Sequence, residues 1–178
     1  MLPYISKIFE KLIHNRMMDF INRHNLLYEH QYGFRPNHST SAAIAHVINH
    51  ITTANEQNQY TIGLFLDLSK AFDCLDYNIL FSKLNNYGFR GTTLNLIKSY
   101  LSNRTQFVSV GNHKSSHLSS LQGVPQGSVL GPLLFLLYIN DIHTTSQILT
   151  FTLYADDTNI LLSGTNPSCK HSIQNFHA

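Results

Sequence analysis

The sequence predicts an α+β fold in which helices pack on an antiparallel sheet. Apolar residues recur at helical spacing near the start of the chain and again before residue 52. Two β-prone runs within 150–162 flank the pair Asp156-Asp157, which predicts a hairpin with both carboxylates at its tip. A third β-prone run, 61–68, contains another aspartate near its end, Asp67. Neighbouring strands would bring the three carboxylates together.

Composition and charge distribution indicate one globular domain or slightly more. The chain has 178 residues, 43% of them hydrophobic, which is enough to bury a core. Its net charge is only +2, but no acidic residue lies between Asp76 and Asp141. A surface built from that interval could bind a phosphate backbone, although a scattered solvated face is the alternative. The cations of the interval are Lys83, Arg90, Lys98, Arg104 and Lys114.

The sequence does not favour a disulfide-bonded protein, a zinc protein, a secreted protein or a membrane protein. Cys74 and Cys169 lie far apart, so neither a disulfide framework nor a thiolate zinc site is indicated. The chain opens without a secretory signal, and its longest apolar run, 133–139, is too short to span a membrane. We therefore expect an intracellular protein of the cytoplasm or nucleus, neither secreted nor membrane-bound.

The first two elements are expected to be helices. The N-terminal helix should run for about five turns, with Glu10 on its polar face. After an irregular stretch that ends near Pro36, Ser39 or Thr40 should cap a helix that reaches Ile51. The buried face of the N-terminal helix should consist of Ile5, Ile8, Phe9, Leu12, Ile13, Met17, Phe20 and Ile21.

The middle of the chain should form a strand, two helices and a hairpin. The run 61–68 is expected to be a buried strand. A helix over 79–87 should stop at Gly88, and a second helix should cover 92–101. Runs 105–110 and 116–120 should pair around a turn at residues 111 and 112.

A glycine-rich loop, 122–128, precedes an apolar run that predicts a helix over 129–142. Its two glycines would let a base or a sugar approach the backbone closely. An ordinary loop between a strand and a helix is the alternative.

The aspartate pair is costly unless a cation is present. Neighbouring like charges at a hairpin tip repel each other, although a solvated turn is the simpler interpretation of the pair alone. Oxygen ligands from adjacent strands, with positions left open for water and phosphate, suit Mg²⁺ or Mn²⁺ rather than zinc. Two such ions, about 3.5–4 Å apart, can activate an attacking hydroxyl and stabilise a leaving pyrophosphate. This chemistry is nucleotidyl transfer.

Four segments resemble motifs of one known family. Residues 65–73 and 154–157 resemble the two aspartate motifs of reverse transcriptases, most closely those of non-LTR retrotransposons. Residues 122–132 are similar to the third palm motif of that family, and residues 33–40 to its fingers motif. The resemblance implies an RNA-directed DNA polymerase that uses two Mg²⁺ or Mn²⁺ ions.

The resemblance also implies a role for individual residues. Asp67 and Asp156 would bridge both metal ions, Asp157 would assist them, and the carbonyl of Leu68 could complete a coordination shell. The incoming nucleotide would meet Arg35 at its triphosphate, Phe72 under its sugar, and Gln126 and Gly127 in the loop. Contacts with nucleic acid are expected from Tyr154, Lys83, Arg90, Lys98 and Arg104.

The domain organisation follows from the same resemblance. Fingers are expected at about 1–60 with part of 77–120, a palm at about 61–76 and 121–163, and a short polar tail at 164–178. A thumb is expected to be missing, and the rest of the element's polyprotein could supply it. Expected partners are an RNA template, a DNA primer and deoxynucleotides. An inactive truncated copy that at most binds nucleic acid, or a metal-dependent phosphohydrolase, remains the alternative.

Overall fold

The computed structural model describes residues 4–165, which form two compact units. Of the described residues, the helical unit comprises 4–26 and 70–139, and the sheet unit comprises 27–69 and 140–165. Helices and antiparallel sheets are both present, so the expected mixture of the two is confirmed. The division into fingers and palm stays a prediction, and nearly all of the expected polar tail lies outside the described residues.

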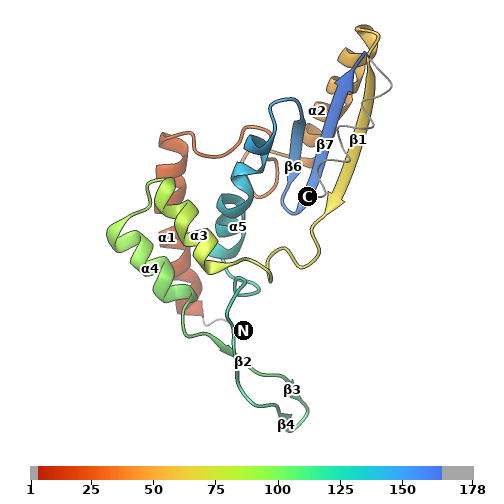
Figure 1. Cartoon of the computed structure of the whole chain (residues 1–178). Coiled ribbons are helices and arrows are strands. Elements are labelled where there is room, and N and C mark those ends of the chain that lie inside the picture. Colours follow the sequence, from red (N-terminus) through yellow and green to blue (C-terminus); the bar gives the residue numbers. More distant parts are fainter. Residues whose placement is uncertain (1–3, 166–178) are drawn as a thin grey trace. The chain divides into compact units, whose positions relative to one another are not determined.

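Four helices build the core of the helical unit (Figure 1). Helix α5 contacts both α1 and α3, and α3 also contacts α4. Helix α5 is apolar on all sides, as expected for a helix surrounded by protein. The helices are α1 (Tyr4–Arg23), α3 (Tyr77–Asn86), α4 (Gly91–Leu101) and α5 (Leu130–Ile139).

The buried face of α1 differs from the expected one. Met17 and Ile21 are buried as expected, but Ile5 and Phe9 are 82% and 55% exposed. Ile8 and Leu12 are also exposed. Glu10, expected on the polar face, is only 1% exposed. Periodicity identified the helix, but it could not show that the carboxylate of Glu10 accepts hydrogen bonds from backbone N–H groups of a distant segment.

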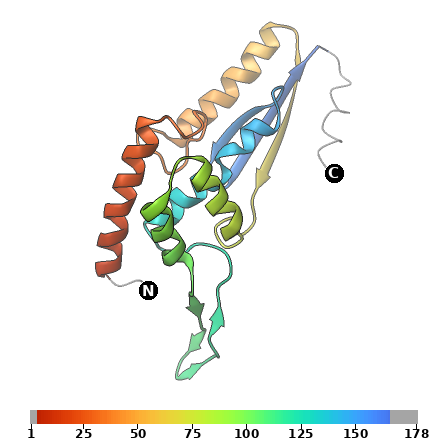
Figure 2. The same cartoon turned by 60° about the vertical axis from the view of Figure 1, so that its left-hand side comes forward.

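Two other expectations for the helical unit need adjustment. The predicted helix over 129–142 is shorter, because α5 ends at Ile139 and a 3₁₀ helix, η1 (Asn140–Thr145), follows. The predicted hairpin is present as an arm with two short ladders instead of one (Figure 2). Its strands are β2 (Thr105–Gln106) paired with β5 (Leu118–Ser119), and β3 (Ser109–Val110) paired with β4 (His113–Lys114).

The sheet unit contains a three-stranded antiparallel sheet in the order β1-β7-β6. Its strands are β1 (Tyr60–Asp67), β6 (Thr150–Tyr154) and β7 (Asp157–Gly164). Helix α2 (Thr40–Glu56) contacts all three strands, and Figure 1 shows it running beside the sheet. Ser39 caps α2 as predicted, because its hydroxyl accepts a hydrogen bond from the N–H of Ala42.

Strand β1 is not the buried strand that the sequence predicted. Residues 63–67 are all exposed, and Phe65 has 65% of its surface exposed. Edge position alone is not the reason, because β6 lies at the other edge of the same sheet and its residues 151–153 are buried. An unbroken apolar run cannot show whether other elements cover the strand.

Candidate active site

Strand pairing places two of the three aspartates opposite each other. Asp67 is the last residue of β1 and Asp157 the first of β7, and they are partners in the antiparallel register. Side chains of directly opposed residues lie on the same face of a sheet. Both residues are exposed, whereas Asp156, in the adjoining turn, is partly buried.

The turn between β6 and β7 has two residues, Ala155 and Asp156. Tyr154 and Asp157 are the last partners of the β6–β7 ladder. Ala155 has a φ of 57°, in the left-handed region that costs a residue with a Cβ about 1–2 kcal/mol. Glycine is the usual residue for such a position in a hairpin turn. The aspartate turn therefore needs support from its surroundings.

Residues 30–32 supply part of that support from beside β6. The N–H of Leu153 donates to the carbonyl of His30 at 2.9 Å, and the N–H of Tyr32 donates to the carbonyl of Leu153 at 2.7 Å. Together they form a single parallel bridge between Gln31 and Leu153. This segment lies within the sheet unit, as does the turn.

The side chain of Gln31 reaches the turn itself. Gln31 is 1% exposed, and its Oε1 accepts hydrogen bonds from the N–H groups of Gly33 at 2.9 Å and Ala155 at 3.2 Å. Gly33 also approaches the turn closely, because a Cβ added to it would overlap the nitrogen of Ala155 and lie 2.9 Å from its Cα. Only glycine fits at this position without a shift of the backbone.

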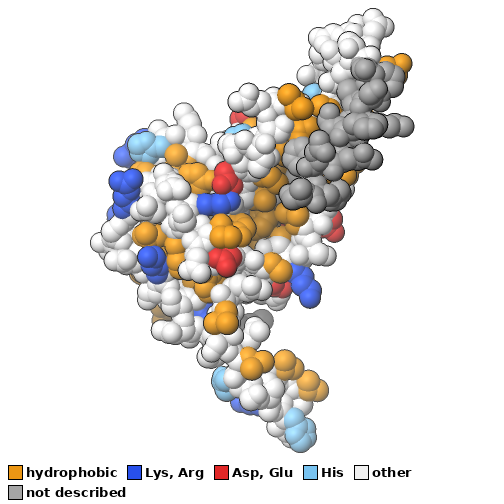
Figure 3. All heavy atoms as spheres, in the orientation of Figure 1, with side chains coloured by type: hydrophobic (Ala, Val, Ile, Leu, Met, Phe, Trp, Pro, Cys, Tyr) orange, Lys and Arg blue, Asp and Glu red, His pale blue; other side chains and the backbone are white. Residues whose placement is uncertain are grey.

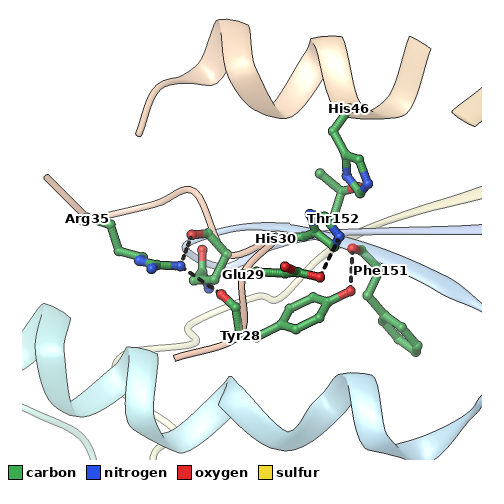
Figure 4. A network of polar contacts seen from close by, with 8 residues as sticks. Tyr28, Glu29, His30, Arg35, His46, Phe151 and Thr152 are labelled. Atoms are coloured by element: carbon green, nitrogen blue, oxygen red, sulfur yellow. Dashed lines mark hydrogen bonds and ion pairs between the residues drawn. The ribbon is translucent and has the colours of Figure 1, made fainter. Parts of the chain in front are cut away.

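Arg35 is tied to the same segment. Its Nη1 donates to the carbonyls of Tyr28 at 2.8 Å and Gln31 at 3.1 Å, as Figure 4 shows. Burial lowers the pKa of Arg35, yet a guanidinium stays charged at neutral pH. One end of the guanidinium therefore anchors the loop.

A group of histidines packs between α2 and β6 in the sheet unit. The rings of His30 and His46 stack with centroids 3.8 Å apart, and Nδ1 of His46 lies 2.9 Å from Oγ1 of Thr152 (Figure 4). His30 also lies 3.4 Å from the carboxylate of the exposed Glu29. Burial, followed by the proximity of His30 and His50, lowers the pKa of His46.

A pocket of 520 Å³ adjoins the aspartates within the sheet unit. Asp67 and Asp157 are among its lining residues, and Ile44, Val47 and Phe65 contribute apolar walls. A concave site with a few converging polar groups is typical of ligand binding.

The expected nucleotide loop is built in the helical unit. Its backbone is fixed to the segment after β1, because the N–H of Val124 donates to the carbonyl of Phe72 at 2.9 Å. Gly123 has a φ of 77°, and a Cβ there would lie 2.6 Å from the carbonyl oxygen of Asp73. The ring of Phe72 packs on Phe135 with centroids 4.6 Å apart.

The loop borders a polar cavity of 820 Å³ in the helical unit. Lys70, Asp73, Gln122 and Gln126 are among its lining residues. Gln126 and Gly127 are exposed, so a ligand could reach both.

Membership of a family is decided by comparison with known proteins. Reverse transcriptase (RNA-dependent DNA polymerase) is the family whose pattern matches the chain, over residues 1–177. The chain belongs to the reverse transcriptase family. The predicted resemblance is confirmed, and the alternative of an inactive truncated copy that at most binds nucleic acid is not favoured.

Relatives of this reverse transcriptase chain include polymerases of Drosophila non-LTR retrotransposons. It is 35% identical over 170 residues to the probable RNA-directed DNA polymerase from transposon BS of Drosophila melanogaster, covering 92% of this chain and 19% of that protein. It is 36% identical over 168 residues to the RNA-directed DNA polymerase from mobile element jockey of the same species, covering 90% and 18%. The chain thus spans about a fifth of the length of these relatives.

Solved structures support the fold. Apo telomerase from Candida tropicalis, truncated from its C-terminal domain, has a TM-score of 0.63 at 14% identity, covering 93% of this chain and 36% of that chain. Telomerase from Candida albicans, in complex with a fragment of telomeric RNA, has a TM-score of 0.61 at 12% identity, covering 96% and 32%. The reverse transcriptase chain therefore shares the fold of these structures.

The cations predicted to contact nucleic acid differ in their surroundings, and their contact with nucleic acid stays a prediction. Lys83 donates to the carbonyl of Tyr138 at 2.7 Å, and Arg104 donates to the carbonyl of Gly123 at 3.0 Å, so both stabilise the helical unit. Arg90 and Lys98 are exposed. On the face drawn in Figure 3, Lys and Arg side chains are scattered instead of forming a continuous band.

Sequence reasoning missed the structural role of three residues, two in the sheet unit and one in the helical unit. They are Gln31 and Gly33 behind the aspartate turn, and Glu10, whose carboxylate accepts from the N–H groups of Val129 at 2.7 Å and Leu130 at 3.3 Å. Gly33 is the first residue of the fingers motif and Gln31 lies two residues before it, which was the available signal. Glu10 gave none, because a glutamate on a helix is ordinarily solvated.

Proposed function

We propose that this chain carries the catalytic region of an RNA-templated DNA polymerase. The observation that carries the proposal is the pairing of Asp67 with Asp157, with Asp156 in the adjoining turn, in a member of the reverse transcriptase family. Deoxynucleotides, a DNA primer and an RNA template are the substrates that this assignment requires. The predicted intracellular location stays a prediction.

The aspartates suit a divalent cation that keeps part of its water shell. Among the described residues, no three or more His, Cys, Asp or Glu side chains lie close enough together to hold a metal ion, and this includes Asp67, Asp156 and Asp157. Mg²⁺ usually binds through one or two carboxylates plus substrate phosphates and water, so an open carboxylate pair fits it better than a closed cage. Asp67, Asp156 and Asp157 would hold such ions, with the carbonyl of Leu68 as a further ligand. Bound Mg²⁺ or Mn²⁺ would lower the pKa of the primer 3′-hydroxyl and stabilise the leaving pyrophosphate.

The remaining site residues would bind and orient the substrates. Arg35, anchored through Nη1, would offer other N–H groups of its guanidinium to the triphosphate. Phe72, whose ring packs on Phe135, would lie under the sugar of the nucleotide. Gln126 and Gly127 would contact the template and the nucleotide from an exposed loop.

Contacts with the primer and template would come from a second set of residues. Tyr154 lines the pocket beside the aspartates, and Arg90 and Lys98 are exposed cations. Lys83 and Arg104 would contribute mainly by holding the helical unit in shape. Tyr154, Arg90 and Lys98 would contact the nucleic acid directly.

The test is primer extension on an RNA template with Mg²⁺ and labelled deoxynucleotides. It would use this chain and a fusion to the segment that follows the matched region in the jockey relative. Asp67→Asn and Asp156→Asn should each lower extension by at least about 100-fold, because the amide loses the charge that holds the cation. The matched control is Asp19→Asn, at an exposed aspartate of α1. Extension by either active-site variant near the wild-type rate would contradict the proposal, as would wild-type proteins that extend no primer.

A further inference from the structure

The N–H of Ala155 is the feature that needs an explanation. In a two-residue hairpin the first turn residue donates no hydrogen bond to the ladder, and Ala155 is 5% exposed. A buried N–H without a partner costs about 1–3 kcal/mol. Oε1 of Gln31 accepts this N–H, so the chain has solved the problem with one side chain from outside the hairpin.

The same carboxamide holds two backbone segments together. Its single oxygen accepts from Gly33 as well as from Ala155, and both hydrogen bonds are buried. The side chain is therefore fixed at its far end, while its backbone is fixed beside β6 through the bridge to Leu153. A side chain held at both ends loses little further entropy when it supports the turn.

The supported residue is also the strained one. Ala155 keeps a φ of 57°, and its neighbour Asp156 is one of the proposed metal ligands. Strain of this kind persists only where the surrounding structure fixes the conformation. Without the acceptor, the turn could relax to another geometry and move the carboxylates of Asp156 and Asp157.

We propose that Gln31 is a positioning residue for the catalytic carboxylates: its buried oxygen holds Ala155 in the left-handed conformation and thereby sets the affinity for the divalent cation. The inference rests on the proposed function for the metal, but the hold on the turn can be measured without any metal. A neutral amide is suited to this place, because a carboxylate would add a fourth negative charge near three aspartates.

The first measurement is amide hydrogen exchange of Ala155 and Gly33 by NMR in the metal-free chain. Gln31→Leu should speed the exchange of both amides by about tenfold or more, since each loses its acceptor. The matched control is Ser39→Ala, which removes the cap of α2 in the same unit and should leave these two amides unchanged. Unchanged exchange in Gln31→Leu would overturn the proposal.

The second measurement is the affinity of the chain for Mn²⁺, by calorimetry or by electron paramagnetic resonance. Gln31→Leu should raise the Kd for Mn²⁺ by about tenfold, because the preorganised ligands become mobile. Ser39→Ala should raise it by less than about twofold. An equal rise in both variants would assign the effect to general destabilisation and overturn the proposal.

A rescue variant separates positioning from mere packing. Glycine adopts a φ of 57° without strain, so Ala155→Gly should restore most of the Mn²⁺ affinity in the Gln31→Leu background. A double variant no better than Gln31→Leu would overturn the proposal. A wild-type chain that binds no Mn²⁺ would contradict the metal part of the proposed function, and the exchange of Ala155 would still decide the role of Gln31.

Discussion

The aspartate turn of the sheet unit and the 122–128 loop of the helical unit are each supported by one buried polar side chain, but the two side chains differ in charge. Gln31 accepts from Gly33 and Ala155 at the turn, and Glu10 accepts from Val129 and Leu130 just after the loop. Both are 1% exposed, and both come from segments far from their partners in the sequence.

The difference in charge follows from what each side chain faces. Glu10 meets the first N–H groups of α5, where a helix carries a partial positive charge that a carboxylate stabilises. Gln31 stands behind a turn that already carries carboxylates, where only a neutral acceptor avoids further repulsion. Burial raises the pKa of Tyr100 to about 12, with a further upward contribution from the charge of Glu10 and an opposing one from Ser128, so that phenol stays neutral beside Glu10. In both regions, the electrostatic potential at the site determines whether the buried acceptor is charged or neutral.

The largest expected effect is that of filling the space behind the turn. Gly33→Ala should lower the free energy of unfolding of the sheet unit by about 3 kcal/mol, because the new Cβ overlaps the backbone of Ala155. Hydrogen exchange followed by mass spectrometry would resolve the two units. The control is Gly111→Ala, whose Cβ meets nothing within 4 Å and whose φ is 58°. It should cost only about 1 kcal/mol, and an equal cost for both variants would contradict the close approach.

The next effect is the loss of the buried carboxylate in the other unit. Glu10→Leu should lower the free energy of unfolding of the helical unit by about 2 kcal/mol, since one buried and one partly buried N–H group lose a charged acceptor. Glu10→Gln should cost about half as much, because an amide oxygen can still accept. The matched control is Asp76→Asn, at the exposed cap of α3. A large change in Mn²⁺ affinity in Glu10→Leu would remove the contrast between the two regions.

Much of the fold could be predicted because it follows local rules. The hairpin at 150–162, the cap at Ser39 and the helix that ends before Gly88 all depend on neighbouring residues, and the structure has them. The exposure of Phe65 and the burial of Glu10 could not be predicted in this way. They depend on which parts of the sheet other elements cover and on which helix end lies beside α1.

In the candidate site, too, residues in local motifs could be predicted, whereas a residue that acts through distant contacts could not. The motifs named Asp67, Asp156 and Asp157, and the register of β1 with β7 explains how distant parts of the chain can act together. The roles of Leu68, Phe72, Gln126, Gly127 and Tyr154 stay predictions. Gln31 was missed because its function lies in one side-chain oxygen and in the φ of a residue far along the chain.

A smaller effect concerns Arg35, which belongs to the support of the turn and to the proposed nucleotide site. Arg35→Lys should cost about 1 kcal/mol of stability, because a lysine cannot reproduce both contacts with the carbonyls of Tyr28 and Gln31. It should also raise the KM for deoxynucleotides severalfold, since the fork that grips phosphate is lost. Lower stability with an unchanged KM in primer extension would assign Arg35 to support of the turn alone.

The smallest expected effect is a loss of stability at low pH that is confined to the sheet unit. The pKa of His46 is lowered from 6.5, chiefly by burial and then by His30 and His50, while Glu29 opposes the shift. Between the lowered pKa and 6.5 the unfolded chain binds more protons than the folded chain, so stability falls as the pH drops below 6.5.

The contact between α2 and β6 should therefore loosen first on acidification. As the pH is lowered from about 7.5 to about 5.5, the rate of hydrogen exchange in α2 should rise after correction for the intrinsic rate. The exchange rate in α5 provides the internal control. His46→Gln can keep a hydrogen bond to Thr152 but cannot be protonated in this range, so it should reduce the rise. The ring of His30, stacked at 3.8 Å, and the ring of Tyr32, at 6.2 Å, face the same histidine. An equal rise in the variant would show that the acid sensitivity of the sheet unit comes from groups other than His46.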